Sequence, residues 1–192
     1  MELSRQGRFV DEPLPGLCDW VAQPQVPSPA GGTVVASCAA LLSALSELIV
    51  RVTREKKGAD AALFDPLLAE VQELRKRLLE YGEGDVYEAA KIIKGELAAC
   101  VRKDVGSPAK IAGTIVKLLR VVETVAAHAK RALYSDVRVV AYMGYAAVYG
   151  ITEIALANIR MAGGADDLLL ERIERWRQEA TDLRDGILAR TE

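Results

Sequence analysis

The chain has 192 residues, a length typical of one domain with a sizeable core. Hydrophobic residues make up 51% of it but aromatic residues only 5%, so Ala, Leu and Val fill the interior, which favours closely packed helices over a sheet. The formal net charge of -2 gives no support for nucleic-acid binding, and three cysteines without metal-ligand or redox spacing (Cys18, Cys38 and Cys100) indicate reduced, cytoplasmic thiols.

The N-terminal part contains one short predicted helix and a loop without regular structure. Residues 1–12 mix acidic and basic side chains, so we expect a flexible segment and no signal peptide. A short helix is predicted over 14–22. The loop 23–33 contains three prolines and ends in Gly31-Gly32-Thr33 just before a helix, so its N–H groups could hold an anion or a carboxylate. A simple lead-in to an N-cap is the better explanation of the local sequence.

Two predicted helices, Thr33–Thr53 and Ser135–Met161, lack a polar stripe. No charged residue lies between Val139 and Ile151. A helix that is apolar on every side must be surrounded by other helices, so we expect both at the centre of the fold. Gly144 and Gly150 each weaken a helix by about 1 kcal/mol, and we expect a neighbouring backbone to approach closely there.

Neither of these helices is expected to cross a membrane. A spanning helix needs about 20 apolar residues. The segment Val34–Val50 contains three serines and Glu47, and Val139–Ile151 is too short alone. The sequence therefore favours a soluble protein.

An amphipathic helix is predicted over Asp60–Tyr81, where leucines and Val71 recur at helical spacing. Gly82-Glu83-Gly84 is predicted to end it. Asp85 is then predicted to cap a shorter helix that runs to about Arg102.

Two further amphipathic helices complete the predicted fold. Ser107 and Pro108 have the pattern of an N-cap and first helical residue, and this helix should reach about Lys130. Gly163-Gly164 should separate the apolar helix before it from a last helix that begins at Asp166-Asp167. No strand pattern occurs, so we predict an all-α, up-and-down bundle of about six helices, forming one domain over residues 1–192.

The common catalytic and metal-binding patterns are absent from the sequence. His128 is the only histidine, and its place near Lys130 and Arg131 favours a surface position over a catalytic one. There is no paired Glu-x-x-His motif and no phosphate-binding glycine pattern between a strand and a helix. We expect no metal.

The order of several weak motifs resembles the formiminotransferase-cyclodeaminase family, which includes methenyltetrahydrofolate cyclohydrolases. A Pro- and Gly-rich loop enters an Ala-rich helix, VPSPAGGTVVASCAALLSAL, over 26–45, and the basic element REKKGAD follows over 54–60. A proline-started helix at Pro108 leads to the pair Ser135-Asp136. The next helix ends in Ala157-Asn158-Ile159-Arg160. The resemblance covers nearly the whole chain.

The sequence also departs from the family pattern at four places. Ala129-Lys130-Arg131-Ala132 stands where relatives have Gly-Asn-x-Asn, and Ala30 replaces the first glycine of the PGGG-type loop. Glu55 replaces the leading glycine of the basic element. Val86-Tyr87-Glu88 stands at an Ala-Phe-Asp element.

The resemblance implies a homodimeric enzyme that acts on a folate one-carbon derivative, as a formimidoyl-tetrahydrofolate cyclodeaminase or a methenyl-tetrahydrofolate cyclohydrolase, without a further cofactor. Asp136, with Ser135 beside it, is the candidate for acid/base chemistry and for stabilising a cationic one-carbon centre, although the local sequence favours an N-cap. Lysines would hold the folate carboxylates, and the glycine loop would bind through its backbone. The candidate substrate-binding residues are Pro29, Gly31, Gly32, Thr33, Lys56, Lys57, Tyr87, Arg131 and Asn158.

Two other functions remain open at this stage. One is a catalytically degenerate helical dimer that binds another small anion or a protein partner. The other is a purely structural dimer. For the enzyme, we expect the loop Pro29–Thr33 of one subunit to meet the Ser135-Asp136 pair of the other, because the two segments lie a helix length apart in one chain.

Overall fold

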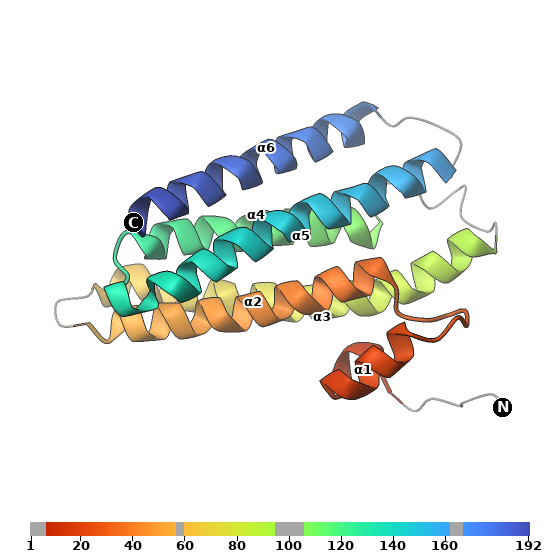
Figure 1. The fold of residues 1–192 in the computed structure, drawn as a ribbon, viewed down its shortest axis with the longest axis horizontal. Coiled ribbons are helices and arrows are strands. Elements are labelled where there is room, and N and C mark those ends of the chain that lie inside the picture. Colours follow the sequence, from red (N-terminus) through yellow and green to blue (C-terminus); the bar gives the residue numbers. More distant parts are fainter. Residues whose placement is uncertain (1–6, 57–59, 95–105, 162–166) are drawn as a thin grey trace.

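The computed structural model describes residues 7–56, 60–94, 106–161 and 167–192. These residues form six α-helices and two single-turn 3-10 helices, with no strand among them, which confirms the all-α prediction. The helices pack as a bundle (Figure 1). Their bounds are α1 Leu14–Val21, α2 Gly31–Arg54, α3 Ala61–Ile93, α4 Ser107–Ala126, α5 Tyr134–Met161 and α6 Asp167–Arg190, with η1 at Phe9–Asp11 and η3 at Arg131–Leu133.

Successive long helices run antiparallel. α2 and α3 form a hairpin in which Ser43 Oγ donates to the Val71 carbonyl at 2.8 Å and Arg54 pairs with Asp65 at 2.7 Å. α2 and α5 are the front layer of Figure 1, and α3 and α4 lie behind them. α5 runs opposite to α2, so the start of each lies beside the end of the other.

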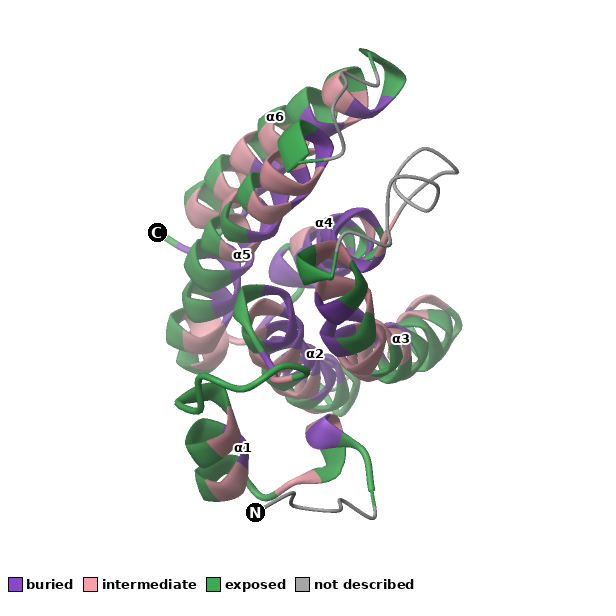
Figure 2. Cartoon of the chain, turned by 90° about the vertical axis from the view of Figure 1, so that its right-hand side faces the viewer, coloured by how far each residue is buried: buried purple, intermediate pink, exposed green. Residues whose placement is uncertain are grey.

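In the single chain, α4 is the most enclosed helix. Fourteen of its 20 residues are buried, because α2, α3, α5 and α6 all pack against it (Figure 2). By contrast, 12 of 24 residues of α2 and 9 of 28 of α5 are buried. Within one chain α4 is thus more enclosed than α2 or α5, and the expectation that α2 and α5 are the central helices of a dimer stays a prediction. The sequence of α4 predicts an ordinary amphipathic helix, because it contains charged residues. The central position could not be predicted from it, because its few cations lie on one narrow stripe.

α2 and α5 each leave large apolar side chains exposed on the side away from α4. We call this the α2–α5 face. Leu41 of α2 lies between Val34 and Leu48 on this face and is 62% exposed. The face comprises Val34, Leu41 and Leu48 on α2 and Val139, Tyr142 and Met143 on α5.

α3 continues through Gly82-Glu83-Gly84, so the predicted break and the N-cap at Asp85 are wrong. Gly82 faces α2 so closely that a Cβ on it would lie 2.9 Å from the Cβ of Ala36. Thr33 Oγ1 donates to the Gly82 carbonyl at 2.9 Å. The glycine serves close packing between two helices, and residues 95–102 of the predicted second helix lie outside the described residues.

The other predicted boundaries lie close to the observed ones. α4 begins at Ser107, with Gly106 as its N-cap, and ends at Ala126 instead of near Lys130. The predicted Gly163-Gly164 separator lies outside the described residues. The buried residues of α6 recur at the spacing of three, four and seven residues that is typical of an amphipathic helix: Leu169, Ile173, Ala180, Leu183 and Ile187.

Gly144 and Gly150 of α5 approach side chains. A Cβ on Gly144 would lie 2.8 Å from Leu119 of α4, and one on Gly150 would lie 3.7 Å from Val35 of α2. We expected a neighbouring backbone to approach these glycines. The atoms nearest to them belong to side chains instead.

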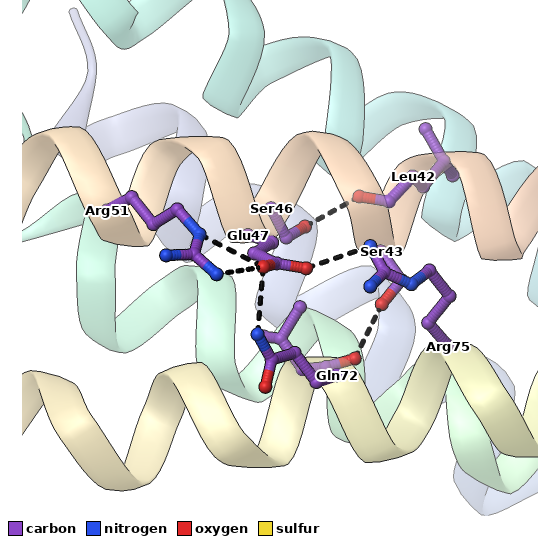
Figure 3. Close-up of polar contacts among 8 residues, drawn as sticks. Leu42, Ser43, Ser46, Glu47, Arg51, Gln72 and Arg75 are labelled. Atoms are coloured by element: carbon purple, nitrogen blue, oxygen red, sulfur yellow. Dashed lines mark hydrogen bonds and ion pairs between the residues drawn. The ribbon is translucent and has the colours of Figure 1, made fainter.

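A buried carboxylate joins α2 to α3 (Figure 3). Glu47 pairs with Arg51 of its own helix at 2.6 Å and with Arg75 of α3 at 2.8 Å, and it accepts a 2.9 Å bond from Gln72 Nε2. These contacts lower the pKa of Glu47, with the Gln72 hydrogen bond as the largest cause. The negative charge is thus compensated from both helices.

Two helices are long and apolar enough to cross a membrane by length and composition alone, over Gly31–Arg54 and Arg131–Met161. Within the bundle, 56% of the apolar window of the first and 39% of that of the second are buried. Core helices of bundles without a membrane meet the same criterion, and both helices here pack against several others.

Candidate active site

The N-terminal end of α2 is shaped by its glycines. Ala30 is the N-cap residue and provides no side-chain hydrogen bond to the first turn. Pro29 is buried, Gly31 is exposed, and a Cβ on Gly31 would lie 2.9 Å from Ile154 of α5. Thr33 directs its hydroxyl to α3 instead of capping its own helix. The N–H groups of this helix end therefore need an acceptor from elsewhere.

Asp85 of α3 supplies that acceptor. Its carboxylate accepts the backbone N–H of Thr33 and lies directly over Gly32, where a Cβ would overlap all three carboxyl atoms. Only glycine leaves room for this contact. A carboxylate at a helix N-terminus is favoured by the partial positive charge of the helix dipole.

The environment of Asp85 nevertheless opposes its ionisation. Its side chain is buried, with the residue only 5% exposed. Burial raises the pKa of Asp85 to about 6, the nearby Glu88 carboxylate adds to the increase, and the Thr33 N–H acts in the opposite direction. Asp85 is therefore a carboxyl group that can exchange a proton near neutral pH.

Further acidic residues of α3 lie around Asp85. Glu88 Oε2 accepts the Ser107 N–H at 2.7 Å and so closes the start of α4. Glu83 accepts the Val10 N–H at 3.3 Å and the exposed Tyr87 hydroxyl at 3.3 Å. Two helix N-termini and three carboxylates thus meet at this end of the bundle.

Asp85 was missed as a site residue because the glycines before it were interpreted as a helix end. One signal could have found it. Val71, Leu74, Leu78, Gly82 and Asp85 follow each other at steps of three and four residues, so Asp85 continues the buried stripe of one long helix. An acid on such a stripe is a buried acid.

The remaining candidates lie at the other end of α2 and α5. Lys56 is exposed just after α2, and Arg131 is exposed on η3. Ser135 is exposed and Asp136 half-buried in the first turn of α5. Lys57 lies outside the described residues.

The structure therefore divides the predicted site into two groups. Pro29, Gly31, Gly32 and Thr33 lie with Tyr87 at one end, and Asn158 is one helical turn beyond Ile154, which packs on Gly31. Lys56, Arg131, Ser135 and Asp136 lie at the other end. The 20 helical steps from Thr33 to Thr53 span roughly 30 Å of helix. One chain does not bring the two groups together.

Among the described residues, no three His, Cys, Asp or Glu side chains are placed to hold a metal ion. His128 is exposed, and its ring lies at right angles to that of Phe64 with centroids 5.8 Å apart.

Comparison with known proteins agrees with the order of motifs. The model of the family described as formiminotransferase-cyclodeaminase matches residues 15–175. Among solved structures, the chain is similar to formiminotetrahydrofolate cyclodeaminase from Thermotoga maritima, with a TM-score of 0.80 and 23% identity over 94% of each chain. At this identity the likeness shows a shared fold. No curated protein sequence matches the chain.

Proposed function

This chain is a member of the formiminotransferase-cyclodeaminase family, and we propose that it acts on a one-carbon derivative of tetrahydrofolate. The reaction is either cyclodeamination of a formimidoyl group or hydrolysis of a methenyl bridge. We further propose that the enzyme is cytoplasmic and needs no additional cofactor.

The placement of Asp85 is the observation that supports catalysis in this particular chain. A buried carboxyl beside another acid costs folding free energy, and such arrangements are concentrated at functional sites. Its pKa of about 6 suits a group that both gives and takes a proton near neutrality. Gly32 lets this carboxyl group lie against the first turn of α2, where it accepts the Thr33 N–H, so the proton-exchanging group is held at a helix N-terminus.

The proposed site is composite across a homodimer. A two-fold axis perpendicular to α2 and α5 would place the start of the partner's α2 over the start of this chain's α5. Asp136 and Lys56 of one subunit would then meet Gly32 and Asp85 of the other. The exposed α2–α5 face supports this contact, because Val34, Leu41 and Leu48 recur at the heptad spacing of helices that pair.

Proton transfer is the chemical requirement that these groups meet. Closing a formimidoyl group into a methenyl bridge forms a bond from the second folate nitrogen to the carbon, delivers a proton to the departing nitrogen and releases ammonia. Opening the methenyl bridge adds water instead. We assign proton transfer to Asp85 and stabilisation of the cationic carbon to Asp136, with Lys56 and Lys57 holding the folate carboxylates. Pro29, Tyr87, Arg131 and Asn158 would line the substrate.

The test is turnover of folates by the wild-type chain and by Asp136→Asn. Methenyltetrahydrofolate absorbs in the near ultraviolet, so its formation or loss is followed directly. Asn keeps the size of Asp136 but removes the charge from the first turn of α5. We expect a nearly unchanged melting temperature and loss of turnover. Strong destabilisation with turnover intact would show that Asp136 serves only the stability of α5.

The alternative is a binding module that keeps the fold without the reaction. It is favoured by Ala129-Lys130-Arg131-Ala132, which stands where relatives have Gly-Asn-x-Asn, close to Asp136. Wild-type chain that binds a folate without converting it would select this alternative. Failure of both binding and turnover would reject a folate function altogether.

A further inference from the structure

A groove of about 330 Å³ lies outside the site described above, along the exposed stripe of α4. We call it the α4 groove. α3 and α6 provide its walls, and neither α2 nor α5 contributes a lining residue. Its charged and aromatic lining residues are Arg77, Tyr81, Lys110, Lys117, Arg120 and Trp176.

The charge lining this groove is entirely positive. Arg77 pairs with Glu73, and Arg120 pairs with Glu179, in each case through Nε. Their terminal guanidinium nitrogens make no hydrogen bond to any described residue. Lys110 and Lys117 make no ion pair within the described part of the chain, whereas Glu80 and Glu70 act from outside the groove lining on Arg77 and Arg120.

Two aromatic rings lie among these cations. Lys110 Nζ is 5.9 Å from the ring centre of Tyr81. The ring of Trp176 crosses Gly113, where a Cβ would lie 3.3 Å from ring atom Cζ2. Because Gly113 has no side chain, the indole lies against α4 as part of the groove wall. The Arg172 guanidinium lies over the same ring, 6.0 Å from its centre, so a planar ligand would contact the part of the indole that lines the groove.

From this arrangement we propose that the α4 groove binds a small anion of about two negative charges that carries a planar ring, a nucleoside monophosphate by chemical class. Free guanidinium nitrogens and two lysines suit a phosphate monoester, which carries close to two negative charges at neutral pH. The indole of Trp176 suits the flat base. The proposal does not depend on folate turnover, since the groove shares no residue with the proposed active site.

Fluorescence of Trp176 provides a local test. The chain contains two tryptophans, so Trp20→Phe leaves Trp176 as the single reporter and keeps an aromatic ring beside Phe9. Titration of this variant with adenosine monophosphate should change the emission saturably. Adenosine lacks the charge and inorganic phosphate lacks the ring. Each should bind at least about tenfold more weakly than adenosine monophosphate. No saturable change, or equal binding of adenosine, would overturn the proposal.

Paired variants on the same background localise the binding. Lys110→Gln combined with Lys117→Gln removes two exposed charges, so the fold should persist while affinity for adenosine monophosphate falls about tenfold. Lys91→Gln removes an equally exposed charge of α3 outside the groove and should leave affinity unchanged. Folic acid, a planar molecule that carries carboxylates, is titrated in the same way. Tighter binding of folic acid than of the nucleotide at Trp176 would contradict the assignment to a phosphate ligand.

Discussion

Asp85 and Glu47 are buried carboxyl groups on neighbouring helices, and their surroundings shift their pKa values in opposite directions. Glu47 is held by Gln72 and two arginines, which lower its pKa. Asp85 receives one backbone N–H and faces Glu88, so burial dominates and raises its pKa. A compensated charge holds two helices together, whereas an uncompensated one is available for proton exchange.

The raised pKa of Asp85 predicts a specific dependence of stability on pH. Between pH 3.8 and about 6 the folded chain holds a proton on Asp85 that the unfolded chain has lost, so this group's contribution to stability falls as pH rises through that window. Asp85→Asn keeps an oxygen for the Thr33 N–H and abolishes the titration. We expect the variant to match wild type near pH 4 and to exceed it by up to about 3 kcal/mol at pH 7.5, measured by urea unfolding.

The difference between variant and wild type at each pH is the quantity to compare, because other carboxyl groups titrate equally in both chains. A difference that is constant from pH 4 to 7.5 would show that Asp85 is not perturbed. The same substitution should abolish folate turnover under the proposed mechanism.

At the level of helices, Gly82 and Gly84 of α3 form a matched pair. Each should gain up to about 1 kcal/mol of helix propensity when changed to Ala. A Cβ at Gly82 would lie 2.9 Å from Ala36 Cβ, which is fixed to the α2 backbone, whereas at Gly84 it would meet the Ser107 hydroxyl at 3.2 Å, which can rotate away. We expect Gly82→Ala to destabilise by about 2 kcal/mol and Gly84→Ala to be close to neutral in thermal unfolding. Similar values for both would rule out close packing as the reason for Gly82.

Most of the helices could be predicted because their signal is local. The apolar residues of α4 and α6 recur mostly every three or four residues, and those at this spacing are buried or half-buried in the bundle. Local spacing could not show whether the helix breaks at Gly82. The glycine is needed there because of Ala36, which lies 46 positions earlier in the sequence. The enclosure of α4 likewise depends on which helices surround it.

The candidate site shows the same limit. The loop Pro29–Thr33 could be identified from its prolines and glycines and from its place before a helix. That Gly32 makes room for Asp85 became visible only when α2 and α3 were placed side by side. Family resemblance identified the Ser135-Asp136 pair, but it did not show that this pair and the loop lie at opposite ends of one chain.

At the scale of the whole molecule, the separation of these two groups and the exposed α2–α5 face point to the same arrangement. A two-fold contact through Leu41 and Met143 would cover apolar side chains that water now meets. It would also bring each loop to the opposite subunit's Asp136.

Mixing two inactive variants tests this arrangement. In a heterodimer of Asp136→Asn and Asp85→Asn subunits, one composite site has lost both carboxylates and the other keeps both. Random exchange of subunits makes about half of the dimers mixed, so we expect the mixture to recover about a quarter of wild-type turnover. Leu41→Glu in both chains places a charge in the α2–α5 face and should abolish dimer formation and the recovery together, as seen by sedimentation and assay. Leu168→Glu, at an apolar position on α6 that is even more exposed than Leu41, should affect neither. If each site were built within one chain, every mixed dimer would contain two defective sites, and mixing would restore nothing.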